Sequence, residues 1–388
     1  MRTPTGDPRT HERERLWTPM TPASVTATST VQVHMTGAEW FATTPGGLNR
    51  YFTDLFRALH ARQDTRVSAS AFGNAAAGGH SWGPSSGSTV ARVWTSLRDD
   101  RGLSSSTVVD RHFSLFGRPA LGRRGRLPSV AHFHGPWAAE SAASGESPAA
   151  VRAKYWVERL RFLDIDRFVV LSEHSARLLR TDYGVDADRI RVIAPGVDLA
   201  RFTVPAERRS DRPTVLCVRR LENRMGIDRL IAAWPAVASA HPDARLLVVG
   251  EGTQESALRA LAANSPASAS IEFLGRVDDA RLRSLYAAAT VSVVPTVALE
   301  GFGLIALESC AVGCPPVVTD CGGLPDAVAG LDPSLIVPAG DAGALAARLT
   351  TALDGVVPGA EACRAHAERF SWDSAAAEHV ELYREVAS

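Results

Sequence analysis

The chain has 388 residues, and its 42 lysines and arginines balance 42 aspartates and glutamates, which gives a formal net charge of zero. A chain of this length is too long for one ordinary hydrophobic core and indicates two domains. The lack of a basic excess argues against a general nucleic-acid-binding protein, and no apolar run is long enough to cross a bilayer.

The N-terminal segment, residues 1–25, is charged but contains no apolar stretch of the kind that signal peptides carry. We interpret it as a disordered leader. The five cysteines mostly occupy apolar contexts, which suits reduced thiols in a cytoplasmic protein. Cys310, Cys314 and Cys321 are close enough in sequence to suggest a zinc site. Their spacing is wide and no histidine is near, so we favour buried small apolar side chains.

Segments typical of strands and helices alternate from about Val31 onward. Strand patterns occupy residues 29–35, 67–72, 129–136 and 190–198. Between the first two, residues 46–62 carry apolar side chains at helical spacing, namely Leu48, Phe52, Leu55, Phe56 and Leu59. The first part of the chain therefore reads as a series of strand–helix units.

A second series of the same kind begins with TVLCV at Thr214 and runs to the helical pattern DAGALAARLTTAL. Such alternation indicates parallel sheets that are covered by helices on both faces. We therefore predict an α/β fold of two doubly wound, Rossmann-like domains, residues 26–195 and 196–370, that face a central cleft. The last segment, residues 371–388, has a helical pattern and could pack back across the first domain. Ligands of such sheets bind at the carboxyl ends of the strands.

One element of the second domain, PTVALEGFGLIALES, places Gly301-Phe302-Gly303 between a strand and a helix. Glycines there allow a ligand to approach the backbone, and the helix N-terminus offers free N–H groups and a positive dipole end. This pattern indicates a phosphate site, with Glu300 positioned for sugar hydroxyls and Glu308 for a ribose diol. A capped helix with two solvated glutamates explains the spacing equally well.

A second loop of the same domain, VRRLENRMG, carries Arg219, Arg220 and Arg224 directly after a strand. Arginines at that position would neutralise a diphosphate leaving group through forked hydrogen bonds. The alternative is a solvated basic turn. Gly250, in the strand-to-helix turn GEG, is weak evidence for a ligand by itself.

In the first domain, Gly46 and Gly47 stand at a predicted helix N-terminus and could form a second phosphate cradle. His134 ends a predicted strand at the cleft, where it could hydrogen-bond a sugar hydroxyl; a structural histidine is the alternative. His132 and His134 share one strand face, so a metal pair is conceivable, but no carboxylate with ligand spacing accompanies them and we do not favour it.

These pieces, in this order, resemble the retaining glycosyltransferases of family 4, which have the GT-B fold. The resemblance runs from about Val31 to the C-terminus and rests on these stretches: PTVALEGFGLIALES with its E-x7-E element, the GGL turn, HGPWAAES, SEHSARLL, APGVDLARF, VRRLENRMGID and CGGLPDAV. Any one of these stretches is weak evidence, whereas the whole series is specific.

The resemblance implies that Glu300 contacts the donor sugar and Glu308 the ribose. The backbone of Phe302, Gly303 and Leu304 would meet the diphosphate or the sugar, and Arg220 would match the phosphate-binding arginine of the family. The usual lysine of the family falls on Met225, which carries no charge. We expect Arg224 to replace it, with Arg219, Gly46, Gly47 and Gly250 completing the donor site and His134 near the sugar. Members of the family need no metal ion, and we expect no cofactor.

The implied reaction is the retaining transfer of a hexosyl group from a nucleotide diphosphate sugar, with a UDP-sugar preferred, to a hydroxyl group. We expect Asn49, Trp137 and Glu140 to line the acceptor side. A small acceptor such as a natural-product cyclitol or aglycone, as in antibiotic biosynthesis, is favoured over a lipid-linked glycan.

Three alternatives remain open. An epimerase or a phosphorylase could share the architecture, but Lys154, the only lysine, lies outside the second domain, where pyridoxal phosphate would need it. Met225 is the only support for a non-catalytic sugar-nucleotide binder. Residues 111–128 combine Phe113, Leu115 and Phe116 with several arginines and could face a membrane. We favour an ordinary helix and basic loop there. The sequence leaves the oligomeric state undetermined.

Overall fold

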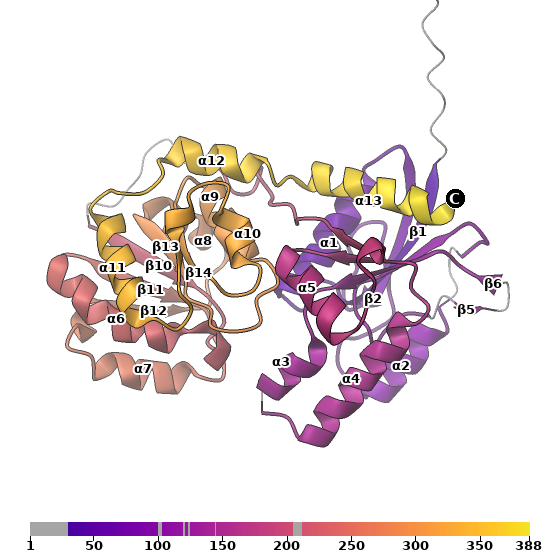
Figure 1. The fold of residues 1–388 in the computed structure, drawn as a ribbon, viewed down its shortest axis with the longest axis horizontal. Helices are drawn as coiled ribbons and strands as arrows, with labels where there is room; N and C mark the ends of the chain where they lie inside the picture. The colour runs from indigo at the N-terminus through magenta and orange to yellow at the C-terminus, as the bar shows by residue number, and fades with distance from the viewer. Residues whose placement is uncertain (1–29, 100–102, 119–120, 123–124, 144, 205–211) are drawn as a thin grey trace, which may run out of the picture.

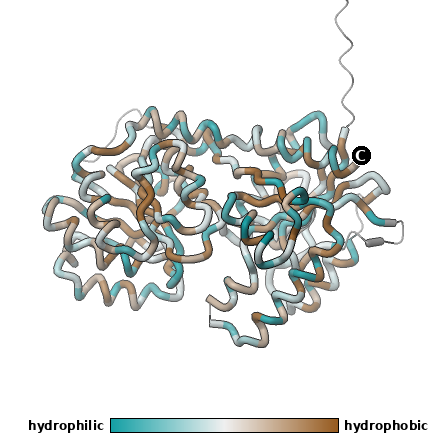
Figure 2. The backbone as a smooth tube through the Cα atoms, viewed as in Figure 1, coloured by the Kyte–Doolittle hydropathy of each residue, from teal (hydrophilic) through white to brown (hydrophobic). Residues whose placement is uncertain are grey.

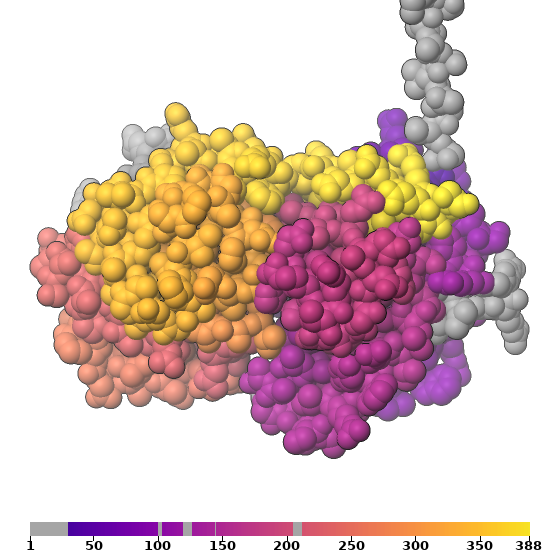
Figure 3. Space-filling model, in the orientation of Figure 1, coloured from indigo at the N-terminus to yellow at the C-terminus, as the bar shows by residue number. Residues whose placement is uncertain are grey.

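A computed structural model describes residues 30–99, 103–118, 121–122, 125–143, 145–204 and 212–388. The predicted leader, residues 1–25, lies outside the described residues. The chain forms two lobes that meet along one side, and Figure 3 shows a notch between them on the lower edge of the view. Figure 2 shows hydrophobic residues concentrated on the strands inside each lobe. Among the described residues, no helix is both long and apolar enough to span a bilayer.

The first lobe is built on a seven-stranded parallel sheet with the order β3-β2-β1-β4-β7-β8-β9. Its strands are β1 (Val31–Glu39), β2 (Thr65–Phe72), β3 (His80–Ser81), β4 (Val108–Arg111), β7 (Ser129–Phe133), β8 (Arg167–Val170) and β9 (Ile190–Val192). A small antiparallel hairpin joins β5 (Leu121–Gly122) to β6 (Gly125–Arg126). The strand order reverses between β1 and β4, which opens a crevice at their carboxyl ends.

The helices of this lobe are α1 (Gly47–His60), α2 (Thr89–Leu97), α3 (Trp137–Ala143), α4 (Pro148–Phe162) and α5 (Glu173–Asp182). The predicted apolar face of α1 is buried, with Phe52, Leu55, Phe56 and Leu59 fully covered and Leu48 partly covered. Ser147 caps α4 by accepting from the Ala150 N–H, and Pro148 follows at the first helical position, so the sequence itself starts this helix there.

The second lobe has a six-stranded parallel sheet with the order β12-β11-β10-β13-β14-β15. Its strands are β10 (Thr214–Val218), β11 (Arg245–Val249), β12 (Ile271–Gly275), β13 (Val291–Val294), β14 (Pro316–Thr319) and β15 (Ile336–Val337). Its helices are α6 (Ile227–Ala240), α7 (Glu255–Ala263), α8 (Asp279–Ala288), α9 (Leu304–Ala311), α10 (Leu324–Val328), α11 (Ala342–Leu353) and α12 (Ala360–Glu368).

The C-terminal helix α13 (Trp372–Ala387) leaves the second lobe and packs on α1, β1, β4 and β7 of the first lobe (Figure 1). Ala376, Val380 and Tyr383 are buried at helical spacing along the side that faces the first sheet. The helix thereby fastens the two lobes together at one end.

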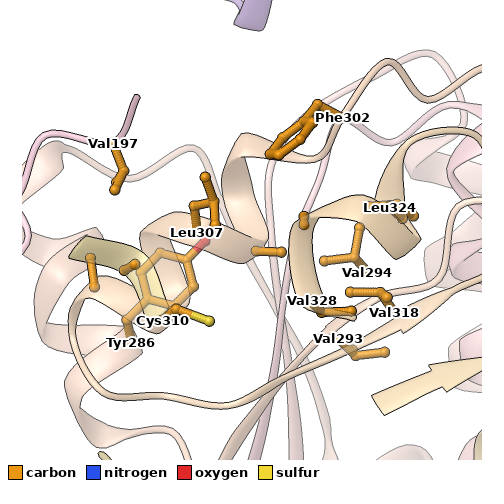
Figure 4. Packing of buried hydrophobic residues seen from close by; sticks show 14 of the residues in the cluster. Val197, Tyr286, Val293, Val294, Phe302, Leu307, Cys310, Val318, Leu324 and Val328 are labelled. Atoms are coloured by element: carbon orange, nitrogen blue, oxygen red, sulfur yellow. The ribbon is translucent and has the colours of Figure 1, made fainter. Parts of the chain in front are cut away.

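The core beneath α9 fixes the loop that precedes this helix. Figure 4 shows Leu307 and Cys310 of α9 close to Tyr286, with Phe302 on the other side of the helix start. All five cysteines are free and buried, including Cys310, Cys314 and Cys321. The interpretation of these three as buried small side chains is confirmed.

The helix that we favoured within residues 111–128 is wrong for the part that the structure describes, because those residues run from the end of β4 through turns to the β5–β6 hairpin. Phe116 is only 3% exposed, and Phe113 and Leu115 are partly buried beside it. The membrane-facing alternative is therefore wrong for these side chains, because they fill a satellite core under α2. Residues 119–120 and 123–124 lie outside the described residues.

Candidate active site

The loop between β13 and α9 adopts the special backbone conformation that its glycines allow. Gly303 has φ of +93°, and a Cβ atom there would overlap Leu324. Leu299 also has a positive φ of 58°, which is unusual for a residue other than glycine. The loop is therefore held tightly in place, with the side chain of Phe302 buried against Phe370 and the N-terminus of α9 left without a side-chain cap. Because its side chain is buried, Phe302 can contact a ligand only through its backbone.

Glu300 is held at the base of this loop by groups from two other segments, the arginine loop after β10 and the Gly322-Gly323 turn. The Arg219 guanidinium donates to its carboxylate and, at 2.5 Å, to the Thr296 hydroxyl. The Gly323 N–H donates to the Glu300 carbonyl at 3.0 Å, and a Cβ atom on Gly322 would overlap that carbonyl. The glycine pair of CGGLPDAV thus exists because the turn passes directly over Glu300.

The arginines that follow β10 diverge. Arg220 is exposed, whereas Arg224 points across the cleft, where its guanidinium donates to the Leu299 carbonyl at 2.6 Å and lies 3.8 Å from Glu140 of the first lobe. Met225 is 4% exposed and belongs to the hydrophobic core. Gly250 has φ of +135° and packs against the Arg219 carbonyl, so this glycine shapes the arginine loop.

His134 and the Glu300 loop meet at the junction of the lobes. A Cβ atom on Gly301 would lie 3.2 Å from the His134 carbonyl, which shows how closely the two backbones approach. The His134 Nε2 atom has no hydrogen-bond partner within the described structure. Burial, helped by His132 and His112, holds the pKa of His134 well below its usual value. The imidazole is therefore neutral at physiological pH and can exchange hydrogen bonds with a sugar hydroxyl.

Behind His134 lies a buried stack of histidine rings. His112 and His132 are 3.7 Å apart between ring centroids, and His379 of α13 stacks on His132 at 5.2 Å. The Asp110 carboxylate lies 3.2 Å from His112 and 3.1 Å from His132, and it accepts from the Tyr383 hydroxyl at 2.6 Å. The network links α13 to β7, the strand that His134 directly follows.

The same cluster bears on the metal question. Nitrogen atoms of His112, His132 and His134 lie within 4.8 Å of one another, and contrary to the sequence-based view a carboxylate, Asp110, accompanies them. The His112 and His132 rings are nearly parallel, with 17° between their planes. Because an imidazole binds metal through a lone pair in its ring plane, stacked parallel rings do not converge on one ion. That the site uses no metal ion stays a prediction.

Glu308 lies on α9 next to the first lobe. Its carboxylate forms an ion pair with Arg50 of α1, at 3.1 Å between Nη1 and Oε1. Burial raises the pKa of Glu308, and Arg50 and Arg201 partly offset this effect. A small crevice around the pair is lined by Leu304, Asp54, Gly196, Asp198 and Trp372, among others. Glu308, the residue predicted to bind the ribose, is thus held in place by an arginine of the other domain.

The glycine pair at the start of α1 leaves open space. No atom lies within 4 Å of a Cβ built on Gly46 or Gly47, and α1 lacks a side-chain cap. The first N–H groups of α1 are therefore open to an anion, and the phosphate cradle at this position stays a prediction.

The three residues expected on the acceptor side differ in their surroundings. Asn49 is 6% exposed, and its amide donates to the Thr44 carbonyl at 2.9 Å, so it braces the loop before α1. Trp137 packs against Phe113 and under the Lys154 ammonium. Glu140 is 42% exposed, faces Arg224, and has a pKa raised by burial despite the nearby arginines. Of the three, Glu140 is the one that faces the cleft.

Comparison with known proteins agrees with this geometry. The model of the family "Glycosyltransferase Family 4" matches residues 45–201, and that of "Glycosyl transferases group 1" matches residues 202–369. A D-inositol 3-phosphate glycosyltransferase of Rhodococcus erythropolis is 33% identical over 305 residues, which cover 72% of this chain and 68% of that protein. The chain belongs to glycosyltransferase family 4.

One further relative and one solved structure show how much of the chain is similar to known proteins. The D-inositol 3-phosphate glycosyltransferase of Acidothermus cellulolyticus is 38% identical over 243 residues, and the chain spans about half of its length, 57% of this chain against 53% of that protein. The structure of Anabaena Alr3699/HepE in complex with UDP and glucose superposes with a TM-score of 0.70 at 18% identity, covering 92% of this chain and 100% of that one. The fold is the GT-B fold of family 4.

Several residues of this family 4 protein were missed by sequence reasoning. Arg50 of α1, Asp110 and His112 at the end of β4, and His379 of α13 come from three separate parts of the chain and meet at the site only in the folded chain. Of these residues, only Arg50 could have been identified from the sequence, because it lies one turn after the Gly46-Gly47 pair at the start of the same helix. The role of the Gly322-Gly323 turn could have been suspected from the CGGLPDAV stretch.

Proposed function

We propose that the protein transfers a hexosyl group from a UDP-sugar to a hydroxyl group of a small polyol, with retention at the anomeric carbon and without a metal ion. The observation that carries the proposal is the meeting of Glu300, the uncapped start of α9 and the neutral His134 at one point between the lobes. Such a point can hold a sugar ring between a carboxylate and an imidazole while a helix dipole faces its phosphate.

The residues then take distinct roles. Glu300 accepts hydrogen bonds from donor-sugar hydroxyls, and Glu308 accepts them from the ribose. As the diphosphate departs, the N–H groups of α9 and the guanidiniums of Arg220 and Arg224 stabilise its charge. The acceptor hydroxyl attacks on the face that the diphosphate leaves, and a phosphate oxygen takes its proton. No carboxylate nucleophile is needed, in contrast to the two-carboxylate glycosidases.

Similarity supports the choice of substrates. The structure of Alr3699/HepE with UDP and glucose supports a UDP-hexose donor, and the inositol phosphate named for two relatives supports a cyclitol acceptor. The second candidate function is sugar-nucleotide binding without turnover, which is favoured only by the uncharged Met225 at the position of the family lysine.

Calorimetric titration of the purified protein with UDP, GDP, ADP and TDP, without divalent metal, tests the donor site. We expect tight binding of UDP alone. Incubation with UDP-glucose and a panel of cyclitols should then release UDP only when an acceptor is present. Binding of none of the nucleotides by folded protein would contradict the proposal, and binding without turnover would support the second candidate.

A further inference from the structure

Large hydrophobic side chains are left exposed on one part of the first lobe. Among the described residues, Val90 and Trp94 of α2 and Trp156, Leu160 and Leu163 at α4 are between 52% and 77% exposed. The remaining exposed large hydrophobic residues are scattered singly over other elements, at Val204, Leu261 and Val356. Single exposed side chains need no explanation, whereas a gathering of five does.

The exposed residues form stripes along their helices. Trp156, Leu160 and Leu163 follow one another at helical spacing, and Val90 and Trp94 are one turn apart on α2. The opposite side of α4 is well packed, with Glu158 and Phe162 buried. Each helix therefore has an inner face that contributes to the fold and an outer face with no apolar cover.

Both outer faces belong to the same side of the first sheet. The connections from β3 to β4 and from β7 to β8 run in the same direction along the sheet, so right-handed crossovers place α2 and α4 on one face. A shared segment joins them: Arg92 of α2 lies over the Phe116 ring at 4.9 Å, and Arg161 of α4 donates to the Phe116 carbonyl at 2.9 Å. Figure 1 shows both helices at the same end of the lobe.

The exposed charges on this surface are positive. Arg98 lies over the Trp94 ring, and Arg152 and Arg159 flank Trp156 on the outer face of α4. The only acidic residue within α2 or α4 is Glu158, which is 2% exposed and accepts from the Trp137 and Ala138 N–H groups. Glu146, just before α4, is paired with Lys154 at 2.6 Å. A chain with no net charge thus concentrates arginine and tryptophan on one face.

We propose that this α2–α4 surface, formed by Val90, Trp94, Arg98, Arg152, Trp156, Arg159, Leu160 and Leu163, docks the protein on an anionic lipid bilayer. Tryptophan and arginine are the side chains that favour the membrane interface, where the indole sits at headgroup depth and the guanidinium meets lipid phosphates. This property is separate from the transfer reaction proposed above.

Two observations favour a bilayer over a second copy of the chain. In a twofold dimer this positive surface would meet the same positive surface of the partner copy, and neither helix has an exposed carboxylate to neutralise it, because Glu158 is buried. In addition, a cavity of about 710 Å³ opens beside α4. Apolar side chains such as Val151, Ala138 and Ala142 form most of its wall, and Arg152, Glu146 and Asp182 supply the charged part. The apolar part of such a cavity suits a lipid chain better than a flat protein partner.

The test is sedimentation of the full chain with vesicles of phosphatidylglycerol and phosphatidylcholine in equal amounts, against vesicles of phosphatidylcholine alone. We expect binding to the anionic vesicles that weakens as salt is raised, with a blue shift of tryptophan fluorescence. The double variants Trp156→Ser/Leu160→Ser and Arg152→Glu/Arg159→Glu should each reduce the vesicle partition coefficient about tenfold or more, since each removes two interfacial contacts. Both change only exposed residues, so their thermal unfolding should match that of the parent.

Leu261→Ser and Arg281→Glu, exposed residues of α7 and α8 in the second lobe, are the matched controls and should bind vesicles like the parent. Absence of binding to anionic vesicles by the parent chain would overturn the proposal, as would equal losses in the controls. A dimer in light scattering that Trp156→Ser/Leu160→Ser converts to a monomer would overturn it in favour of self-association. None of these outcomes depends on nucleotide binding or turnover.

Discussion

Arg50 of α1 and Glu308 of α9 form an ion pair that connects the two domains, with 3.1 Å between Nη1 and Oε1. Both side chains are largely buried, at 18% and 10% exposure. The helix that begins at the Gly46-Gly47 pair therefore also holds the carboxylate that we expect to bind the ribose. Donor binding and the contact between the domains should be coupled through this pair.

Arg50→Ala should shift the pH dependence of UDP binding. Burial already raises the pKa of Glu308, and Arg50 opposes that effect, so removing Arg50 raises the pKa further. A protonated Glu308 is a poorer acceptor for the ribose hydroxyls. UDP affinity should therefore fall as the pH is lowered, and should fall at a higher pH in Arg50→Ala than in the parent. Calorimetry across neutral and acidic pH measures this, with Arg50→Lys as the charge-preserving control; superimposable profiles would remove Glu308 from the ribose site.

Glu300→Ala should abolish transfer while the fold stays intact. We expect kcat/KM to fall by about 100-fold or more, because an interaction with the donor sugar at the reacting centre is lost. The substitution also leaves Arg219 without its carboxylate, so Glu300→Gln serves as the control that keeps a hydrogen-bond acceptor. UDP affinity and thermal unfolding report on the remainder of the site. Near-normal turnover by Glu300→Ala would contradict the role assigned to this residue.

Arg224→Ala should mainly weaken donor binding, whereas Met225→Ala should mainly lower the stability of the fold. Arg224 reaches the cleft, so its loss should weaken donor binding more than the loss of Met225 does, with little change in stability. Met225 is buried in the core, so Met225→Ala should lower the free energy of unfolding by about 2–5 kcal/mol and leave UDP affinity largely unchanged. Met225→Leu conserves volume and is the control for both measurements. Equal effects on UDP affinity would show that Arg224 does not replace the family lysine.

The histidine stack should make the protein sensitive to acid. Burial lowers the pKa of His132 and of His379 to about 4 from an ordinary value of 6.5. Between those values the unfolded chain binds protons that the folded chain does not, so stability is lost as the pH falls from about 6.5 toward 4. Each histidine contributes up to about 1.4 kcal/mol per pH unit in this window.

Substitution tests the assignment of that slope. His379→Gln should be less stable at neutral pH, but its free energy of unfolding in urea should depend less steeply on pH between 4.5 and 6.5. The buried Asp110 acts separately. Although burial opposes its charge, His132 and His112 hold its pKa well below the usual value, so its contribution is lost only at more acidic pH. An unchanged slope in His379→Gln would assign the acid sensitivity to other groups.

Turnover should be unaffected by EDTA and should not rise when Mg²⁺ or Mn²⁺ is added. The predicted diphosphate contacts are arginines and helix N-terminal N–H groups, which already supply positive charge. Initial rates with UDP-glucose, measured after exhaustive chelation and after metal addition, decide this. A metal-dependent rate would return the His112, His132 and His134 cluster to consideration as a ligand set.

The local structures and the positions of the ligand-binding loops could be predicted from the amino-acid pattern. Alternating strand and helix patterns gave two parallel sheets, since each pattern reflects the face that an element must bury. The Gly301-Phe302-Gly303 loop could be placed between a strand and a helix from the patterns on either side of it, and the positive φ of Gly303 explains the second glycine. The buried cysteines and the apolar face of α1 followed from the same reasoning.

The pairing of groups that are distant in sequence became visible only in the folded chain. Glu300 is held by Arg219, and Glu308 by Arg50, 258 positions away; no local pattern encodes either contact. Asp110 lies beside His132 because β4 and β7 are neighbours in the sheet. His379 joins them because α13 returns to the first lobe. Phe116 is buried and Trp156 is exposed for a related reason. The apolar pattern of a segment shows which side chains lie on one face, but the tertiary fold determines whether other elements cover that face.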